Sequence, residues 1–329
     1  MSAVGSFSGL PIDNPEALQD VEVEVPRPGP RDLLVRVMAV SVNPVDIKQR
    51  IALAPSETPV ILGYDAAGII EAIGSEVSTR SVGDEVWYSG DITRPGTNAQ
   101  FHTVDERLVA RKPESLSFAD AAALPLTMIT AWESLFERFE LTKASTGDLL
   151  IMGGAGGVGS AMIQLVKALT GVRVIATASR EASRRWALGM GADVVIDHRK
   201  LREEAGAAAP DGVDWLFTSR SAGNIEDYAE IVKPFGHITA IDEPPNLDLL
   251  ALKSKSIAWH WELMFTRSLF GYDMCVQQQQ LAHIAQLVDE GVLSTTRTRS
   301  IDDFSAAGLR EAHQAVESGR MVGKIVVHR

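Results

Sequence analysis

The chain has 329 residues, enough for about two domains, and 45% of them are hydrophobic, so each domain can bury a substantial core. The 43 acidic side chains outnumber 31 basic ones, and the net charge of −12 argues against nucleic acid or an anionic membrane as a partner. With Cys275 as its single cysteine, one chain can form neither a disulfide framework nor a thiolate metal cluster.

The first third of the chain predicts a domain built mainly of β-strands. Residues 21–25 alternate apolar and acidic side chains, which is typical of a strand with one buried face. Further β-rich runs lie at 33–40, 67–74 and 83–88, and Gly, Pro, Asp and Ser separate them. We therefore expect a mostly β domain over residues 1–125.

A glycine-rich loop between a predicted strand and a predicted helix is the most informative feature of the sequence. An apolar strand at 149–152 precedes the loop, and apolar residues at helical spacing follow it as far as Leu169. A dinucleotide pyrophosphate needs this order: Gly154 permits a sharp turn, Gly156 lets the backbone approach phosphate, and Gly159 lets helix and strand pack closely. The helix start also offers unpaired N–H groups and a positive dipole to the anion. The residues predicted to bind the cofactor here are Gly154, Gly156, Gly157, Val158 and Gly159. The alternative is a turn with only a structural role.

The end of the next predicted strand, 172–178, indicates which dinucleotide is bound. About 20 residues beyond the last glycine, an NAD site usually has an Asp or Glu that binds the ribose hydroxyls, and this chain has Ala178, Ser179 and Arg180 instead. The lack of a carboxylate removes repulsion against a 2′-phosphate, and arginine supplies a planar, permanently charged donor. We therefore predict NADPH, with Ser179, Arg180 and Arg184 among its ligands. The alternative for the arginines is a solvated helix face.

Alternating strands and helices continue to about residue 268, as in a doubly wound parallel sheet. Three further strands are expected, at 194–196, 215–217 and 237–241. A helix around 278–290 and a strand at 324–327 end the chain. We expect a dinucleotide-binding domain over 126–268, and we expect residues 269–329 to return to the first domain.

The chain shows no sign of export or of membrane insertion. Its N-terminus has no basic segment followed by an apolar one, so no signal peptide is evident. No apolar run reaches the roughly 18 residues of a membrane span. We expect a cytoplasmic protein.

Seven short motifs carry a resemblance to one enzyme superfamily. They lie at 41–48, 62–68, 82–86, 121–125, 153–159, 191–193 and 323–327. Together they resemble the medium-chain dehydrogenases/reductases, and within them the zinc-free quinone oxidoreductase branch. Residues 260–267 are most similar to proteins often labelled zinc-type alcohol dehydrogenase-like. The resemblance implies an α/β protein with a GroES-like β domain, a Rossmann domain that binds NADP(H), a substrate cleft between them and a homodimer.

The resemblance also bears on metal. Where zinc-dependent members have Cys and His ligands, this chain has Asn43 and Tyr64, and the remaining ligand position falls near Ala123. Amide, phenol and methyl groups are poor zinc ligands. The structural zinc of those enzymes needs four closely spaced cysteines, which are absent here. We therefore expect no metal, and reduction of an electrophilic acceptor in preference to alcohol oxidation.

The resemblance implies roles for several other residues. Asn43 resembles an Asn near the nicotinamide ribose and substrate, and its alternative role is to cap a turn. Tyr64 would donate its hydroxyl to a substrate oxygen, or be a buried structural tyrosine. Thr127 resembles a Thr that packs on the nicotinamide ring, in a segment that otherwise reads as an amphipathic helix, and His198 falls where relatives contact the adenosine phosphate. The aromatic stretch 259–265 lines a pocket or an interface, or belongs to the core.

The sequence thus predicts an NADPH-dependent oxidoreductase that transfers hydride to a small quinone or α,β-unsaturated carbonyl compound without zinc. The cofactor would carry the chemistry and the protein would position it. An enoyl thioester reductase and a zinc-dependent alcohol dehydrogenase are alternative enzymes. A non-enzymatic, crystallin-like NADPH-binding protein is the alternative from another class.

Overall fold

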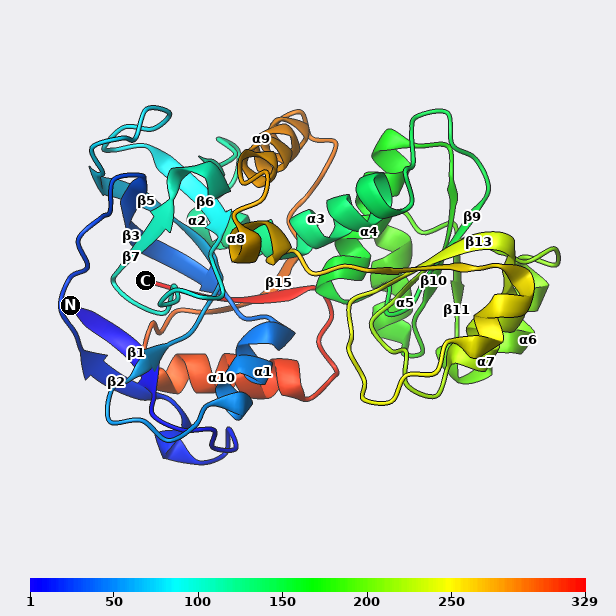
Figure 1. The fold of residues 1–329 in the computed structure, drawn as a ribbon, viewed down its shortest axis with the longest axis horizontal. Coiled ribbons are helices and arrows are strands. Elements are labelled where there is room, and N and C mark those ends of the chain that lie inside the picture. The colour runs from blue at the N-terminus through cyan, green and yellow to red at the C-terminus, as the bar shows by residue number, and fades with distance from the viewer. The chain divides into compact units, whose positions relative to one another are not determined.

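A computed structural model describes residues 1–329 and divides the chain into two compact units (Figure 1). Unit 1 comprises Met1–Ile129 and Phe265–Arg329, and unit 2 comprises Thr130–Met264. Both borders lie close to the expected ones, after residues 125 and 268, and the C-terminal residues belong to unit 1.

Unit 1 is built around a seven-stranded sheet with the order β15-β16-β3-β5-β6-β8, in which β7 also pairs with β3. Its strands are β3 (Asp32–Ser41), β5 (Asp65–Ile73), β6 (Glu85–Ser89), β7 (Phe101–Asp105), β8 (Val109–Arg111), β15 (Arg297–Ile301) and β16 (Lys324–His328). The last strand of the chain, β16, runs antiparallel to β3, so Val326 lies opposite Ser41. A smaller sheet contains β1 (Ser2–Ser6), β2 (Gln19–Glu22) and β4 (Val60–Ile61).

The helices of unit 1 cover a core of buried aliphatic side chains. They are α1 (Pro44–Ala52), α2 (Phe118–Ala122), α3 (Pro125–Trp132, whose last residues enter unit 2), α8 (Thr266–Phe270), α9 (Cys275–Asp289) and α10 (Ala306–Glu317), with short 3-10 helices η1 (Pro15–Ala17) and η2 (Glu106–Leu108). Helix α10 packs Leu309 and Ala312 into this core, because residues three apart share a helix face. Ser305 caps the helix by accepting hydrogen bonds from the backbone N–H groups of Ala307 and Gly308.

Unit 2 contains a six-stranded parallel sheet with the order β11-β10-β9-β12-β13-β14. Its strands are β9 (Asp148–Ile151), β10 (Arg173–Thr177), β11 (Val194–Ile196), β12 (Val213–Thr218), β13 (Val232–Ala240) and β14 (Ala258–Trp261). Residues Leu149–Ile151 and Val174–Ala176 are wholly buried, as expected for strands covered on both faces. The doubly wound parallel sheet predicted from the sequence is therefore confirmed.

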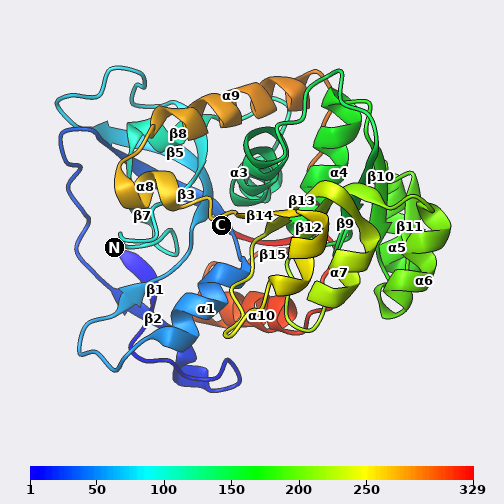
Figure 2. The same ribbon diagram turned by 45° about the vertical axis from the view of Figure 1, so that its right-hand side comes forward.

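Helices surround this sheet, as Figure 2 shows. They are α4 (Gly157–Leu169), α5 (Glu181–Gly189), α6 (Leu201–Ala208) and α7 (Ile225–Ile231), with the π-helical turn η3 (Glu133–Arg138) and the 3-10 helices η4 (His198–Lys200) and η5 (Leu250–Lys255). None of the helices in the molecule combines the length and apolar character that crossing a bilayer requires.

Three predicted elements differ from the structure. The strand expected at 21–25 ends at Glu22, because its partner β1 begins opposite it at Ser2. The helix at 126–132, expected to be amphipathic, is buried on every face from Leu126 to Ala131. The aromatic stretch 259–265 begins as β14, the edge strand of the parallel sheet, in which Trp261 is 51% exposed.

Candidate functional site

The glycine loop of unit 2 follows β9 and turns at Gly153, not at Gly154. Gly153 has a φ of +74°, which side chains rarely adopt, and its N–H donates to Thr177 Oγ1 over 2.8 Å. Gly154 lies against β10, where a Cβ would come within 2.6 Å of Ala176 Cβ. Both glycines therefore serve the close approach of the loop to β10, and the role of Gly153 was not predicted from the sequence.

Two other glycines, at the start of α4, differ in whether the fold leaves room for a side chain. A Cβ on Gly159 would lie 2.4 Å from the Gly153 carbonyl oxygen, whereas a Cβ on Gly156 would meet nothing closer than 3.4 Å. The first helical bond runs from Ser160 N to Gly156 O at 2.9 Å. The N–H groups of Gly157, Val158 and Gly159 precede that bond and lie at the positive end of the helix dipole.

The tip of β10 carries no carboxylate. Ser179 is half-buried, and Arg180 is exposed at the start of α5. Arg184 donates to the carbonyl oxygens of Ala178 and Val195, at 3.1 and 2.7 Å, and so ties the ends of β10 and β11 together. Arg185 is exposed and forms an ion pair with Glu181, 3.2 Å apart, as expected for a solvated helix face.

Parallel pairing brings the predicted cofactor residues of unit 2 to one edge of its sheet. Strand β9 lies between β10 and β12, so the chain order reverses at β9, which is where ligands bind in such sheets. His198 follows β11 in η4 and is half-buried. Next to His198, Asp197 accepts hydrogen bonds from Arg199, and these hold the pKa of the Asp197 carboxyl below its usual range. The Asp197 carboxylate is therefore ionised and paired with Arg199.

Asn43 in unit 1 is buried and bonded on both sides of its amide. Its Nδ2 donates to Asp65 Oδ2 at 2.7 Å and to Ser41 O at 3.3 Å, and its Oδ1 accepts from Lys324 Nζ at 2.5 Å. Its backbone N–H donates to Asp46 Oδ2 at 2.6 Å, at the start of α1. Both amide hydrogens of Asn43 are therefore used inside the protein, and the side chain makes no hydrogen bond to the first turn of α1.

Tyr64 precedes β5 and is 3% exposed. Its ring packs edge-on against Phe265, with ring centroids 5.3 Å apart, and its hydroxyl makes no hydrogen bond to a protein group. Burial raises the pKa of this hydroxyl, and the carboxyl groups of Asp46 and Asp91 raise it further. The group therefore keeps its proton at neutral pH and is a hydrogen-bond donor.

Thr127 lies in the first turn of α3 and is also buried. Its hydroxyl donates to the Leu124 carbonyl oxygen at 3.0 Å, so only its methyl group is left for an apolar contact. The adjacent N–H of Leu126 donates to Asp65 Oδ1 at 2.7 Å. One carboxyl group, Asp65, thus binds both Asn43 and the segment that carries Thr127.

The donor set of unit 1 does not fit zinc. No group of three His, Cys, Asp or Glu side chains in the protein is arranged to hold a metal ion. At the place where zinc would bind, the Asn43 side-chain oxygen already accepts from the Lys324 ammonium group, and Ala123 offers only a methyl group. Zinc needs converging N, S or O ligands, and an ammonium group at that point opposes a second cation.

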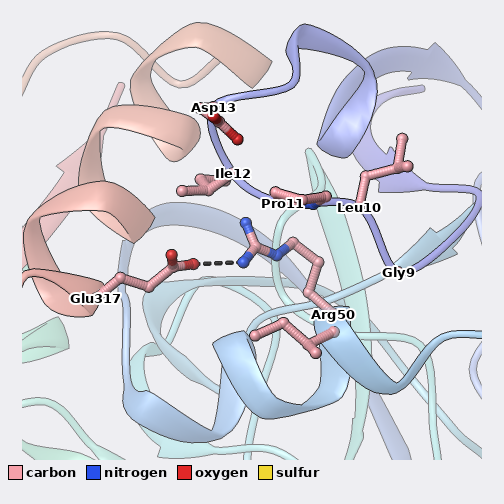
Figure 3. Close-up of a pocket in the computed structure, with 8 residues that line it drawn as sticks. Gly9, Leu10, Pro11, Ile12, Asp13, Arg50 and Glu317 are labelled. Carbon is pink, nitrogen blue, oxygen red and sulfur yellow. Dashed lines mark hydrogen bonds and ion pairs between the residues drawn. The ribbon is translucent and has the colours of Figure 1, made fainter.

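A cavity of about 410 Å³ lies elsewhere in unit 1, between residues 9–13, the end of α1 and the end of α10 (Figure 3). The buried guanidinium group of Arg50 donates to Glu317 there, and its Nε and Nη1 have no protein partner. Asp13 and Glu317 give the lining two carboxylates against one guanidinium, and none of the predicted site residues lines it. This charge balance does not favour a phosphate-bearing cofactor.

Known proteins are similar to this chain in residues of both units. An alcohol dehydrogenase GroES-like domain matches residues 29–114, and a zinc-binding dehydrogenase family matches residues 190–327. The chain is similar to a zinc-type alcohol dehydrogenase-like protein of Staphylococcus epidermidis, with 40% identity over 100% of this chain and 99% of that protein. It is 31% identical to 2-methylene-furan-3-one reductase of Solanum lycopersicum, over 98% of this chain and 76% of that protein. It is 36% identical to a chloroplastic NADPH-dependent alkenal/one oxidoreductase of Arabidopsis thaliana, over 67% of this chain and 57% of that protein.

Solved structures of dehydrogenases and quinone oxidoreductases have a similar fold. A Rhizobium etli protein named after the zinc-dependent alcohol dehydrogenases is 44% identical, with a TM-score of 0.95 over 100% of this chain and 98% of that chain. A quinone oxidoreductase from Coxiella burnetii is 26% identical, with a TM-score of 0.84 over 100% of this chain and 99% of that chain. The likeness in both cases extends over both units.

Proposed function

Because the chain belongs to the medium-chain dehydrogenase/reductase superfamily, in its quinone oxidoreductase-like branch, we propose that it is an NADPH-dependent reductase of quinones or α,β-unsaturated carbonyl compounds. Membership makes the protein an oxidoreductase with a nicotinamide cofactor. The observation that carries the finer proposal is the β10 tip, which offers Ser179 and Arg180 and no carboxylate to the adenosine ribose. The names of two relatives, an enone reductase and an NADPH-dependent alkenal/one oxidoreductase, support it.

The residues of unit 2 fit the proposed cofactor. Room at Gly156 and the free N–H groups at the start of α4 suit a pyrophosphate, and Arg180 suits a 2′-phosphate, with His198 and Arg184 at the neighbouring strand ends. NADPH would supply the hydride. The protein would bind and orient it, since orientation at near-attack distance accounts for much of the acceleration in such reactions.

Unit 1 would supply the donor for the acceptor's oxygen. Hydride transfer to an enone or quinone leaves negative charge on the carbonyl oxygen, and a preorganised donor stabilises that charge. Tyr64 is our candidate, because its hydroxyl is protonated and has no protein partner. Asn43, with both amide hydrogens in use, would hold this region in place, and Thr127 would offer its methyl group to the nicotinamide ring.

The deciding experiment is an NADPH-oxidation assay with small quinones, enones and an enoyl thioester. Turnover with quinones or enones supports the proposal. Preference for the thioester would favour the enoyl thioester reductase. NADPH binding without turnover of any acceptor would favour the non-enzymatic alternative, which the glycine loop accommodates equally well.

Arg180→Ala is expected to lower NADPH affinity about tenfold, or about 1.4 kcal/mol, and to leave NADH affinity nearly unchanged. The reason is that only NADPH carries the 2′-phosphate that the exposed guanidinium would bind. Titration of the apo protein with both dinucleotides measures this. Arg185→Ala is the matched control, because Arg185 is also an exposed arginine, lies within α5 and forms an ion pair with Glu181. Equal losses for NADPH and NADH, or a similar loss in Arg185→Ala, would contradict the proposed role.

Activity is expected to be independent of zinc. The reason is that Asn43, Tyr64 and Ala123 offer zinc no ligand set and Lys324 already places an ammonium group there. Elemental analysis should find far less than one zinc ion per chain, and a chelator should leave the rate of NADPH oxidation unchanged. Stoichiometric zinc that is lost together with activity would instead favour a zinc-dependent alcohol dehydrogenase.

We also propose a homodimer in the cytoplasm. Strand β14 is the edge of the parallel sheet, and Trp261 and Leu263 near it are half exposed, so a second copy would cover both the open backbone edge and these side chains. Light scattering should give twice the mass of 35.5 kDa, and Trp261→Lys should shift the protein toward monomer. A wild-type monomer would exclude this arrangement. Cell fractionation tests the compartment.

A further inference from the structure

Lys324, at the start of the last strand, carries a buried ammonium group. The side chain is 5% exposed, and its Nζ donates to Val42 O at 2.8 Å and to Asn43 Oδ1 at 2.5 Å. Asp65 Oδ2 lies 3.9 Å from the same nitrogen. The ammonium group therefore fixes which side of the Asn43 amide faces β16, and leaves the NH2 side for Asp65.

Asp65 connects the Asn43 amide to α3 through two hydrogen bonds. Its Oδ2 accepts from Asn43 Nδ2, and its Oδ1 accepts from Leu126 N–H, both at 2.7 Å. Tyr64 is the residue before Asp65, and Thr127 is the residue after Leu126. A continuous set of hydrogen bonds thus runs from β16 through Asn43 and Asp65 to the beginning of α3, next to two residues proposed for the reaction.

The positive charge of Lys324 stabilises the ionised forms of two buried carboxyl groups in the cluster. Asp65 and Asp46 are both buried, and burial raises their pKa values, to about 6 and about 7, although the positive charge of Lys324 acts to lower both. Asp65 accepts its two hydrogen bonds fully only when ionised, so they weaken as the pH falls through the pKa of its carboxyl. Without the ammonium group both pKa values rise further, because an opposite charge is lost. The titratable groups that face Lys324 and these carboxyls are Asp46, Asp65 and Tyr64.

We propose that Lys324 is a positioning residue of the reductase site: its ammonium group orients the Asn43 amide and, through Asp65, holds the start of α3 and so the neighbouring Tyr64 and Thr127. This inference rests on the proposed function, since it assigns Lys324 to the same reaction. Lys324 touches neither substrate nor cofactor in this proposal. Its loss is expected to affect turnover and its pH dependence, and to leave NADPH binding at the glycine loop unchanged.

The test compares Lys324→Met with two other variants. Lys324→Met should lower kcat at least about tenfold at neutral pH, leave the NADPH Kd within about twofold, and move the acid limb of the kcat–pH profile upward by at least about one pH unit. Lys324→Arg keeps the charge and should keep the acid limb near its wild-type position, even where the larger group lowers kcat. Lys112→Met is the matched control, because Lys112 is also buried in unit 1, at 5% side-chain exposure, and donates to two backbone carbonyl oxygens.

A measurement that does not depend on activity distinguishes a failure of the Lys324 role from a failure of the proposed reductase function. Amide hydrogen exchange over residues 123–132 should be at least about tenfold faster in Lys324→Met than in Lys112→Met, because Leu126 N–H loses an ionised acceptor. An unmoved acid limb, or equal exchange in the two methionine variants, would overturn the role of Lys324. If the wild type reduces no acceptor, the proposed function fails, and the exchange result alone decides whether Lys324 organises this segment.

Discussion

Gly156→Ala is expected to leave the fold intact and to weaken NADPH binding at least about a hundredfold. The backbone at Gly156 has φ −79° and ψ 176°, which any residue adopts, and an added Cβ would meet nothing closer than 3.4 Å. The methyl group would occupy the space that a pyrophosphate needs beside the first N–H groups of α4. Losing two charge-assisted hydrogen bonds costs about 3 kcal/mol or more, which corresponds to the hundredfold loss.

Two other glycine variants are the controls for this result. Gly159→Ala would place a Cβ 2.4 Å from Gly153 O and 2.7 Å from Gly154 Cα, so the backbone must shift, and both Tm and NADPH affinity should fall. Gly189→Ala, in α5, would meet nothing within 4 Å, so it should bind NADPH normally and melt slightly higher. Isothermal titration and thermal melting on the same preparations measure both quantities. Wild-type affinity in a folded Gly156→Ala variant would show that this loop does not hold the pyrophosphate.

The sequence predicted the elements whose cause is local. Strands β9 and β10 are short apolar runs buried on both faces, and α4 follows a loop whose glycines have the spacing that a pyrophosphate needs, so their positions could be predicted. Strand β14 was not predicted as a strand, because its Trp, His, Trp sequence fits a core, a pocket or a strand equally well. Its pairing with β13 at the sheet edge depends on the tertiary structure.

The site was predictable to the same extent. The role of Gly153 was missed because its positive φ goes with a hydrogen bond from its N–H to Thr177, which lies on another strand. The part played by Lys324 was missed because it depends on sheet register: Val326 lies opposite Ser41 on β3, and Ser41 lies opposite Asp65 on β5. That register brings together residues more than 200 positions apart in the chain. A lysine at the start of an apolar terminal strand was the one available signal, since a buried lysine requires a partner.

Tyr64→Phe is expected to lower kcat tenfold to hundredfold, or about 1.4–2.7 kcal/mol, with NADPH affinity little changed. The reason is that the hydroxyl is the proposed donor to the acceptor's oxygen, and a donor that acts on developing charge contributes mainly to kcat. Steady-state kinetics with one quinone and one enone, together with NADPH titration, measure the effect. The phenyl ring keeps the edge-on contact with Phe265, so packing is preserved.

Thermal stability separates this role from that of a structural tyrosine. The Tyr64 hydroxyl makes no protein hydrogen bond, so its removal should leave Tm unchanged or raise it slightly, since a buried polar group without a partner is unfavourable. Tyr88→Phe is the matched control, because the buried Tyr88 hydroxyl is bonded to His102 Nδ1 at 2.9 Å, and its removal should lower Tm without lowering kcat. If Tyr64→Phe instead lowers Tm and keeps full turnover per folded molecule, Tyr64 belongs to the packing of unit 1, and the donor to the oxyanion must be a backbone N–H group or water.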